Sequence, residues 1–334
     1  MDIILIGMGT VGKGLLQILR DKEELLWDKE SFEAHVVGVA TKSHGVLYCE
    51  DGLDLEALLK GIATYPAQSG LRRDWDVTRL VRDGKADVVV EASPTDLKTA
   101  QPALDLCRLA FKSGKHVVLA NKGPVAVAYD ELQALAKTSG KLLRFEATVM
   151  AGTPSIRLGM QALAGCKIEK VRGIFNGTTN YMLTQMDGGM SYAEALKQAQ
   201  ALGYAEADPT ADVDGWDAAG KGIILAAALF GKKLTLEQMS VSGIRTIKPE
   251  DMTAAKAANE RYKLIVEVST EGGTVAPTRI PTDHPLAGVS GANNAITYVT
   301  DLLGEVTLIG KGAGGVQTGF GILSDLLEIA QFLG

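Results

Sequence analysis

Short apolar runs alternate with helix-like stretches over the first 145 residues of this 334-residue chain. Continuous apolar strands with helices between them are typical of a parallel sheet that is covered on both faces. Residues 41–85 are longer and less regular than a usual crossover, so we expect an insertion with short helices there. The strand-like runs are IILI (3–6), HVVGVA (35–40), ADVVVEAS (86–93), KHVVLANK (115–122) and KLLRFEA (141–147).

The pattern changes at about residue 146, where strand-like segments gather with few crossovers and predict a separate α+β unit over residues 146–309. Residues 310–334 return to a Gly-rich loop followed by an amphipathic helix. We expect this last segment to pack on the first unit, so the first domain is predicted as 1–145 plus 310–334. The strand-like segments are KVRGIFNG (170–177), KLIVEVSTEGGTVAPTRI (263–280) and AITYVTDLLGEVTLIG (295–310).

Composition narrows the class of protein. The chain is 46% hydrophobic and 22% charged, with 34 basic and 40 acidic residues and a net charge of -6. No long run of one sign occurs, which argues against nucleic acid or an anionic membrane as the main partner. The three cysteines, at positions 49, 107 and 166, suggest no disulfide framework, so a reducing cytoplasm is expected.

The hydropathy pattern of the chain does not indicate a membrane protein. The opening MDIILIGMGT lacks the features of a targeting segment. The longest apolar run, IILAAALF at 223–230, is far shorter than the roughly 20 residues that span a bilayer. We therefore expect a soluble protein.

The strongest motif is LIGMGTVGKG, which places Gly7, Gly9 and Gly12 in the spacing G-x-G-x-x-G. It directly follows a predicted strand and opens a predicted helix, the context that makes this motif a dinucleotide signal. The glycines allow a tight turn and a close approach of the backbone to a pyrophosphate at the helix N-terminus. A plain Gly-rich turn is the alternative.

The residue after the second strand normally separates NAD from NADP. Here Ala40 is followed by Thr41, Lys42 and Ser43, with no carboxylate to bond a ribose 2'-hydroxyl. A cation and two hydroxyls suit a 2'-phosphate, so NADP is favoured over NAD. A solvated loop lysine is the alternative interpretation of Lys42.

An acidic block, GYAEADPTADVDGWDAAGK, covers residues 203–221. Its D-x-D-G stretch resembles part of an EF-hand, but that alignment puts Lys221 at the twelfth position, where a bidentate Glu is required. Calcium is therefore excluded. Asp217 and Lys221 are four residues apart on a helix that continues as an apolar segment, so a lysine held by a carboxylate as a general acid is one interpretation. An exposed salt bridge of little energetic worth is the other.

Two further segments end predicted strands of the first domain. Ser93 and Pro94 follow one strand. Asn121 and Lys122 follow the next, at the edge where open α/β sheets bind ligands. Ordinary loop residues are the alternative for both. The four histidines show no metal-ligand spacing.

The stretch FNGTTNYMLTQM (175–186) places an amide, a glycine and two hydroxyls where an apolar segment meets a helix. Thr and Asn can cap the free N–H groups of a helix start. The same groups can hold a small anionic ligand. Local chemistry does not separate these two interpretations.

Taken together, the motifs resemble homoserine dehydrogenase nearly end to end and in the family's order. The resemblance implies reversible NAD(P)H-dependent reduction of L-aspartate 4-semialdehyde to L-homoserine, in threonine and methionine biosynthesis. It also implies a Rossmann-type domain completed by the C-terminal helix, a substrate-binding and dimerisation domain at 146–309, and a homodimer. The matching motifs are GMGTVGKG, ANKGPVA, FEATVMAGTPSI, GIFNGTTNYML, LGYAEADPTADVDGWDAAGK, HPLAGVSGANNAI and GKGAGGVQTG.

The resemblance also assigns roles to residues. Lys221 is expected to be the proton donor with Asp217 as its orienting partner, and Lys122 to lie between nicotinamide and substrate. The expected substrate-binding residues are Gly177, Thr178, Tyr204, Glu206 and Asp212, the two carboxylates facing the substrate ammonium. The expected cofactor-binding residues are Gly7, Gly9, Thr10, Val11, Gly12, Ala40, Lys42, Ser93, Lys122 and Gly312. A sodium or potassium ion is expected at Glu146, Val149, Ala151 and Thr153, mainly on carbonyl oxygens.

Relatives with an amino-acid-sensing domain or an aspartate kinase extend beyond the segments present here, so no response to threonine through such a domain is expected. The alternative enzyme is another amino-acid-linked NAD(P) reductase, such as an aspartate dehydrogenase, which would not need the acidic block. A redox-sensing regulator should bring a basic helix pair for DNA, and the sequence has none.

Overall fold

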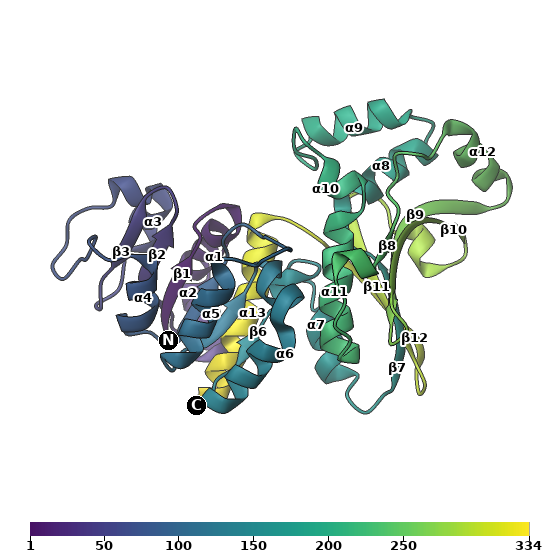
Figure 1. Cartoon of the computed structure of the whole chain (residues 1–334). Helices are drawn as coiled ribbons and strands as arrows, with labels where there is room; N and C mark the ends of the chain where they lie inside the picture. Colours follow the sequence, from purple (N-terminus) through teal and green to yellow (C-terminus); the bar gives the residue numbers. More distant parts are fainter. Residues whose placement is uncertain (334) are drawn as a thin grey trace. The chain divides into compact units, whose positions relative to one another are not determined.

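The computed structural model describes residues 1–333, which form two compact units. Unit 1 comprises Met1–Gly152 and the C-terminal segment from Gly314, and unit 2 comprises Thr153–Ala313. Figure 1 shows the chain coloured along its length, with the yellow C-terminal helix α13 among the purple and blue elements of unit 1.

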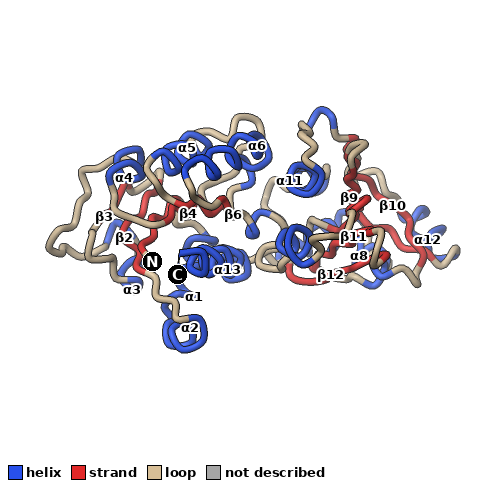
Figure 2. The backbone as a smooth tube through the Cα atoms, turned by 90° about the horizontal axis from the view of Figure 1, so that it is seen from below, coloured by secondary structure: helices blue, strands red, loops and turns tan. Residues whose placement is uncertain are grey.

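Unit 1 contains a six-stranded sheet of order β3-β2-β1-β4-β5-β6. All neighbouring strands are parallel except β2 and β3. Apolar side chains fill the central strands because both faces are covered. Figure 2 shows helices α4, α5 and α6 on one side of the sheet and α1 and α13 on the other. The strands are β1 (Asp2–Ile6), β2 (His35–Thr41), β3 (Gly45–Tyr48), β4 (Val88–Glu91), β5 (His116–Leu119) and β6 (Leu143–Arg144).

The helices of unit 1 contribute apolar side chains to the core that they form with the sheet. Leu15 and Leu16 of α1 and Ile322 and Leu326 of α13 are buried in one cluster with the strands. A side chain at Gly14 would lie 2.1 Å from the carbonyl oxygen of Gly315, so α1 and α13 pack with their backbones in close approach. The helices are α1 (Thr10–Asp21), α2 (Glu23–Glu30), α3 (Leu55–Lys60), α4 (Val77–Asp83), α5 (Ala103–Lys112), α6 (Lys122–Ser139) and α13 (Gly315–Leu333).

The insertion at 41–85 contains the expected short helices α3 and α4, and also a strand that the sequence pattern did not predict. Strand β3 pairs with β2 in antiparallel register, with Thr41 opposite Gly45 and Gly38 opposite Tyr48. Only four residues long, β3 carries too few positions for period-two alternation to stand out. It makes one edge of the otherwise parallel sheet antiparallel.

Unit 2 contains a second six-stranded sheet of order β12-β11-β7-β9-β10-β8. Its strands pair in antiparallel fashion, except that β8 and β10 are parallel. This is the α+β arrangement that the grouped strands indicated. The strands are β7 (Ile168–Ile174), β8 (Ser240–Val241), β9 (Glu260–Ser269), β10 (Gly273–Pro281), β11 (Asn293–Thr300) and β12 (Gly304–Lys311).

Helix α11 is the central helix of unit 2 and packs on β9 and β10. Every residue from Ala218 to Ala227 is buried, as the continuous apolar segment predicted. Within residues 1–333, no helix is both long and apolar enough to cross a membrane. The helices of unit 2 are α7 (Ser155–Arg157), α8 (Gly177–Asp187), α9 (Tyr192–Ala201), α10 (Thr210–Val213), α11 (Trp216–Phe230) and α12 (Pro249–Ala257).

Candidate active site

The Gly-rich loop of unit 1 lies between β1 and the start of α1. Gly7 has φ +94°, and a side chain there would lie 2.5 Å from the carbonyl oxygen of Ala92. A side chain at Gly12 would lie 2.3 Å from the carbonyl oxygen of Gly7, whereas one at Gly9 would meet no protein atom within 4 Å. The loop is therefore tight on its inner side and open at Gly9, which fits a backbone that a pyrophosphate can approach. Thr10 and Val11 form the first turn of α1.

The turn after β2 carries the residues expected to read the ribose. Ala40 is buried, and Lys42 is exposed in the hairpin that joins β2 to β3. Thr41 Oγ1 accepts a hydrogen bond of 3.1 Å from the N–H of His44, which holds the turn in shape. No carboxylate occurs between Thr41 and Gly45, so the turn presents hydroxyls, a cation and an imidazole.

The carboxyl ends of β4 and β5 are joined by a buried polar network. The N–H of Ser93 donates to Glu91 Oε1 at 2.8 Å, and Asn121 Nδ2 donates to Ser93 Oγ at 3.3 Å. Burial raises the pKa of the Glu91 carboxyl, which is 1% exposed. Asn121 caps α6, and its neighbour Lys122 begins that helix with its N–H donating to Thr95 Oγ1 at 3.3 Å. The network thus fixes the backbone at Ser93 and Lys122.

The N-terminus of α8 in unit 2 is the stretch in which helix capping and ligand binding were both possible. Asn176 is the cap, because its Oδ1 accepts from the N–H of Thr179 at 2.9 Å. Thr178 Oγ1 donates to the carbonyl oxygen of Tyr204 at 2.5 Å. The ring of Tyr204, which is 45% exposed, packs at 5.0 Å between centroids against Tyr181. The hydrogen bond from Thr178 therefore holds the backbone of Tyr204 against the first turn of α8.

Lys221 and Asp217 form a partly buried ion pair on α11. Lys221 Nζ lies 2.7 Å from Asp217 Oδ2 and donates to the carbonyl oxygen of Phe175 at 2.5 Å. The Lys221 side chain is only 9% exposed and that of Asp217 is 23% exposed, so the pair is not an exposed salt bridge. The helix carries this lysine inward because the rest of its sequence is apolar.

Asp212 joins the same cluster. Asn176 Nδ2 donates to Asp212 Oδ1 at 2.6 Å and to Asp217 Oδ2 at 3.0 Å, and Thr178 Oγ1 lies 3.1 Å from Asp212 Oδ2. The pKa of Asp212 is raised, first by burial and then by the neighbouring charge of Asp217. Two carboxylates, one ammonium and one amide therefore share this corner of unit 2, and both burial and the charge of Asp217 disfavour the ionised form of Asp212.

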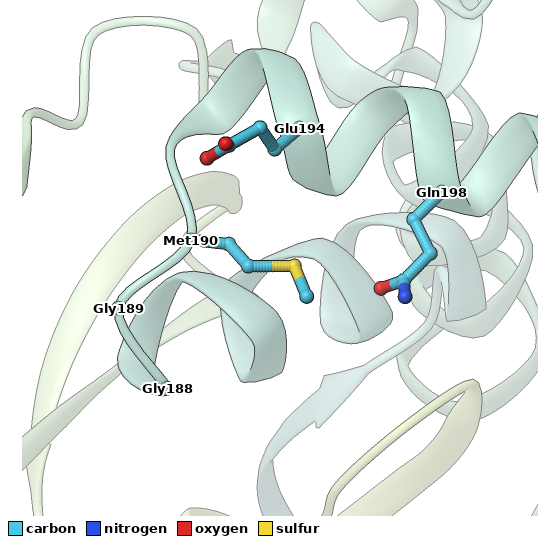
Figure 3. Close-up of a pocket in the computed structure, with 5 residues that line it drawn as sticks. All are labelled: Gly188, Gly189, Met190, Glu194 and Gln198. Carbon is cyan, nitrogen blue, oxygen red and sulfur yellow. The ribbon is translucent and has the colours of Figure 1, made fainter.

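Other expected residues lie apart from this cluster. Glu206 has an exposed side chain, and its backbone carbonyl accepts from Gln200 Nε2 at 3.0 Å. Gly312 packs on the side chain of Asn294, since a side chain at Gly312 would lie 2.0 Å from Asn294 Cγ. A pocket of about 390 Å³ lies where α8 turns into α9, lined by Gly188, Gly189, Met190, Glu194 and Gln198 (Figure 3). None of its lining residues was expected in the site.

The expected cation loop runs from the end of unit 1 into unit 2. Glu146 and Ala151 are buried, with exposed fractions of 3% and 4%. Met150 and Ala151 have φ of +58° and +55°, an uncommon backbone conformation for residues other than glycine. Thr153 Oγ1 donates to the carbonyl oxygen of Lys311 at 2.9 Å.

Two polar residues of these networks were not among the residues expected from the sequence. Asn176 bridges two carboxylates, and Glu91 supports the strand ends of unit 1. A signal existed for Asn176, which stands directly before the glycine of the NGTT stretch. No comparable signal existed for Glu91, because a carboxylate at the end of an apolar strand resembles an ordinary loop entry.

Comparison with known proteins agrees with both units. The family model described as "Homoserine dehydrogenase" matches residues 154–327, and the model "Homoserine dehydrogenase, NAD binding domain" matches residues 7–146. An NAD(+)-dependent homoserine dehydrogenase of Pseudomonas canavaninivorans is 41% identical over 98% of this chain and 96% of its own. A homoserine dehydrogenase of Methanocaldococcus jannaschii is also 41% identical, over 98% of both chains.

A solved structure shows the same fold. The homoserine dehydrogenase of a hyperthermophilic archaeon in complex with NADPH superposes with a TM-score of 0.83 at 30% identity, covering 99% of this chain and 98% of that one. Sequence models, full-length relatives and this structure therefore agree on one activity, and the alternative of an aspartate dehydrogenase is not favoured. The chain belongs to the homoserine dehydrogenase family of NAD(P)-dependent oxidoreductases that act on a CH–OH group.

Proposed function

We propose that Lys221, held by Asp217, is the proton donor in the reduction of L-aspartate 4-semialdehyde to L-homoserine. The observation that supports this most directly is the partly buried Lys221–Asp217 pair, which Asn176 ties to Asp212. A reduced nicotinamide supplies the hydride when it is bound. As negative charge grows on the carbonyl oxygen, the Lys221 ammonium stabilises that oxygen and gives it a proton.

The neighbouring residues divide the remaining tasks. Asp217 keeps the ammonium charged and oriented, because an opposite charge at hydrogen-bond distance favours the charged form. Asp212 and Glu206 bind the substrate ammonium, and the raised pKa of Asp212 is offset when that cation arrives. Gly177, Thr178 and Tyr204 hold the amino-acid portion of the substrate. In unit 1, Lys122 is proposed to lie beside the nicotinamide.

The activity is tested by following reduced nicotinamide at 340 nm with homoserine and either NADP or NAD. We expect homoserine-dependent formation of reduced cofactor, and the same assay with aspartate should give none. Oxidation of aspartate at a higher kcat/KM than homoserine would overturn the proposal.

We propose NADP as the preferred cofactor, because the turn at Thr41, Lys42 and Ser43 offers a cation and hydroxyls and no carboxylate. The named relatives do not decide the preference, since one is NAD(+)-dependent and another was solved with NADPH. Lys42→Ala is expected to raise the KM for NADP several-fold and leave that for NAD within about two-fold, because an exposed charge pair is worth only about 1 kcal/mol. Equal changes for both cofactors would show that Lys42 does not read the 2'-phosphate.

We also propose a monovalent cation at the 146–153 loop, held by Glu146 and by carbonyl oxygens of Val149, Ala151 and Thr153. The buried carboxylate and the left-handed backbone at Met150 and Ala151 support it. A sodium or potassium ion there would raise the unfolding temperature, which is measured by exchanging the salt for a large organic cation at equal ionic strength. An unchanged unfolding temperature would exclude the ion.

We propose a homodimer, assembled through unit 2. The exposed apolar side chains of Leu302, Leu303 and Ile309, at 52–71% exposure on the edge hairpin of β11 and β12, support this surface. Light scattering after size exclusion measures the mass, and a monomer at micromolar concentration would exclude the proposal.

A further inference from the structure

The loop 289–293 enters β11 and is fastened to helix α8 by one buried amide. Asn180 Nδ2 donates to the carbonyl oxygens of Val289, Gly291 and Asn293, at 3.2, 2.9 and 3.0 Å. The Asn180 side chain is 0% exposed. Three carbonyls of one loop thus converge on a single side chain, which fixes the course of the loop relative to α8.

Lys263 of β9 also holds the 289–293 loop, through Asn180 and Val289. Its Nζ donates to Asn180 Oδ1 at 3.1 Å and to the carbonyl oxygen of Val289. The lysine is 3% exposed, and its hydrogen bonds within the described residues go to two neutral oxygens. Burial, together with the charge of Arg261, lowers the pKa of Lys263 to about 8, against a smaller opposing effect of Asp187.

A buried ammonium whose hydrogen-bond partners are all neutral is unfavourable for folding, since no carboxylate at hydrogen-bond distance offsets its desolvation. An apolar residue of similar length would fill the same space on β9 without that cost. The position of Lys263 therefore indicates a role beyond stability, namely to orient the amide of Asn180 and the carbonyl of Val289.

A second, uncharged anchor acts on the same loop. Thr184 Oγ1 accepts from the N–H of Gly291 at 3.2 Å and donates to the carbonyl oxygen of Asn180 at 2.7 Å. This threonine lies one turn after Asn180 on α8. The loop is thus held at the carbonyl and at the N–H of the same residue, Gly291.

The 289–293 loop also packs directly against the first turn of α8. A side chain at Gly177 would lie 2.8 Å from the carbonyl oxygen of Ala292, so the loop backbone and the helix start are in direct contact. The same turn carries Thr178, whose hydroxyl contacts Asp212 and the backbone of residue 204. A shift of the loop would therefore displace the residues proposed to bind the substrate.

We propose that Lys263 and Asn180 are positioning residues for the reaction, which fix the 289–293 loop against Gly177 and so set the geometry of the substrate-binding turn. This rests on the proposed function, because the turn is proposed to hold the amino-acid substrate. Neither residue needs to touch the substrate. Their loss should affect binding of the amino acid and leave the cofactor in unit 1 alone.

The test compares Lys263→Met, Thr184→Val and the control Arg261→Met in homoserine oxidation with NADP. We expect the KM for homoserine to rise about ten-fold in Lys263→Met and a few-fold in Thr184→Val. Each variant loses one hydrogen bond to the loop and one to Asn180, and Lys263 also orients the amide that holds three carbonyls of the loop. The KM for NADP and the NADPH dissociation constant should stay within two-fold of the original values. Arg261 is a partly exposed cation on the same strand, and its contacts are with Asp187 and the carbonyl oxygen of Ala287, outside the 289–293 loop. Arg261→Met should therefore leave the KM for homoserine and the KM for NADP unchanged.

The outcomes separate two failures. If the unsubstituted enzyme does not oxidise homoserine, the proposed function and this inference both fall. If it is active but Thr184→Val and a folded Lys263→Met keep its homoserine KM, or raise the homoserine and NADP constants equally, only the positioning role falls. Should Lys263→Met fail to fold, Thr184→Val alone decides, because it removes no charge.

Discussion

Lys221→Ala is expected to lower kcat by roughly 10² to 10⁴, the range for loss of a general acid, while NADPH still binds. The hydride step places negative charge on the carbonyl oxygen, and the variant lacks the Lys221 ammonium that is proposed to stabilise this charge and to donate the proton. Steady-state kinetics in both directions measure the loss.

Folding must be controlled, because Lys221 is buried and its removal leaves Asp217 and the carbonyl of Phe175 without its ammonium. Lys221→Met retains the length of the stem, and its unfolding temperature and NADPH affinity show whether the variant is intact. Lys197→Ala, on the exposed face of α9, is the matched control and should keep normal turnover. Near-normal kcat in a folded Lys221→Met would reduce this lysine to a structural ion pair.

Asp217→Asn should have a smaller effect than loss of the lysine. The amide still accepts a hydrogen bond from Lys221, but it no longer supplies the charge that favours the ammonium. This ordering follows from the division of roles, in which one residue transfers the proton and the other orients it. If both substitutions cost the same, the pair acts as a unit.

The parts of the fold that could be predicted from the sequence are those in which one period dominates. Continuous apolar runs in β1 and β5 predicted buried parallel strands, and the apolar course of α11 predicted its burial. Strand β3 was missed because four residues are too few for a period. Its pairing depends on a hairpin turn at Thr41 to Gly45 rather than on its own pattern.

The candidate site was predictable only where neighbours in the sequence are also neighbours in space. Asp217 and Lys221 are one helical turn apart, so their contact follows from helix geometry. Asn176 lies 41 residues from Asp217, and their hydrogen bond depends on how α8 and α11 pack. Lys263 is further still from Asn180 along the chain, and a lysine in a strand gives no sign by itself that it is buried.

The Gly-rich loop offers a substitution that separates cofactor binding from folding. Gly9 has φ -79° and ψ -156°, which any residue adopts, and an added Cβ would meet no protein atom within 4 Å. Gly9→Ala should therefore fold normally. If the open side of this loop faces the pyrophosphate, the new methyl group occupies space that the cofactor needs, and the NADPH dissociation constant should rise roughly 10- to 100-fold, or about 1.4 to 2.8 kcal/mol.

Two other Gly→Ala substitutions serve as comparisons, because they add the same methyl group at different places in the structure. Gly288→Ala, in unit 2, also adds a methyl group where no protein atom lies within 4 Å, so NADPH affinity and unfolding temperature should both be unchanged. Gly12→Ala places its methyl group 2.3 Å from the carbonyl oxygen of Gly7, so it should lower the unfolding temperature as well as the affinity. Fluorescence titration with NADPH and thermal unfolding measure the three variants together. Tight NADPH binding by a folded Gly9→Ala would mean that the backbone at Gly9 is not where the pyrophosphate approaches.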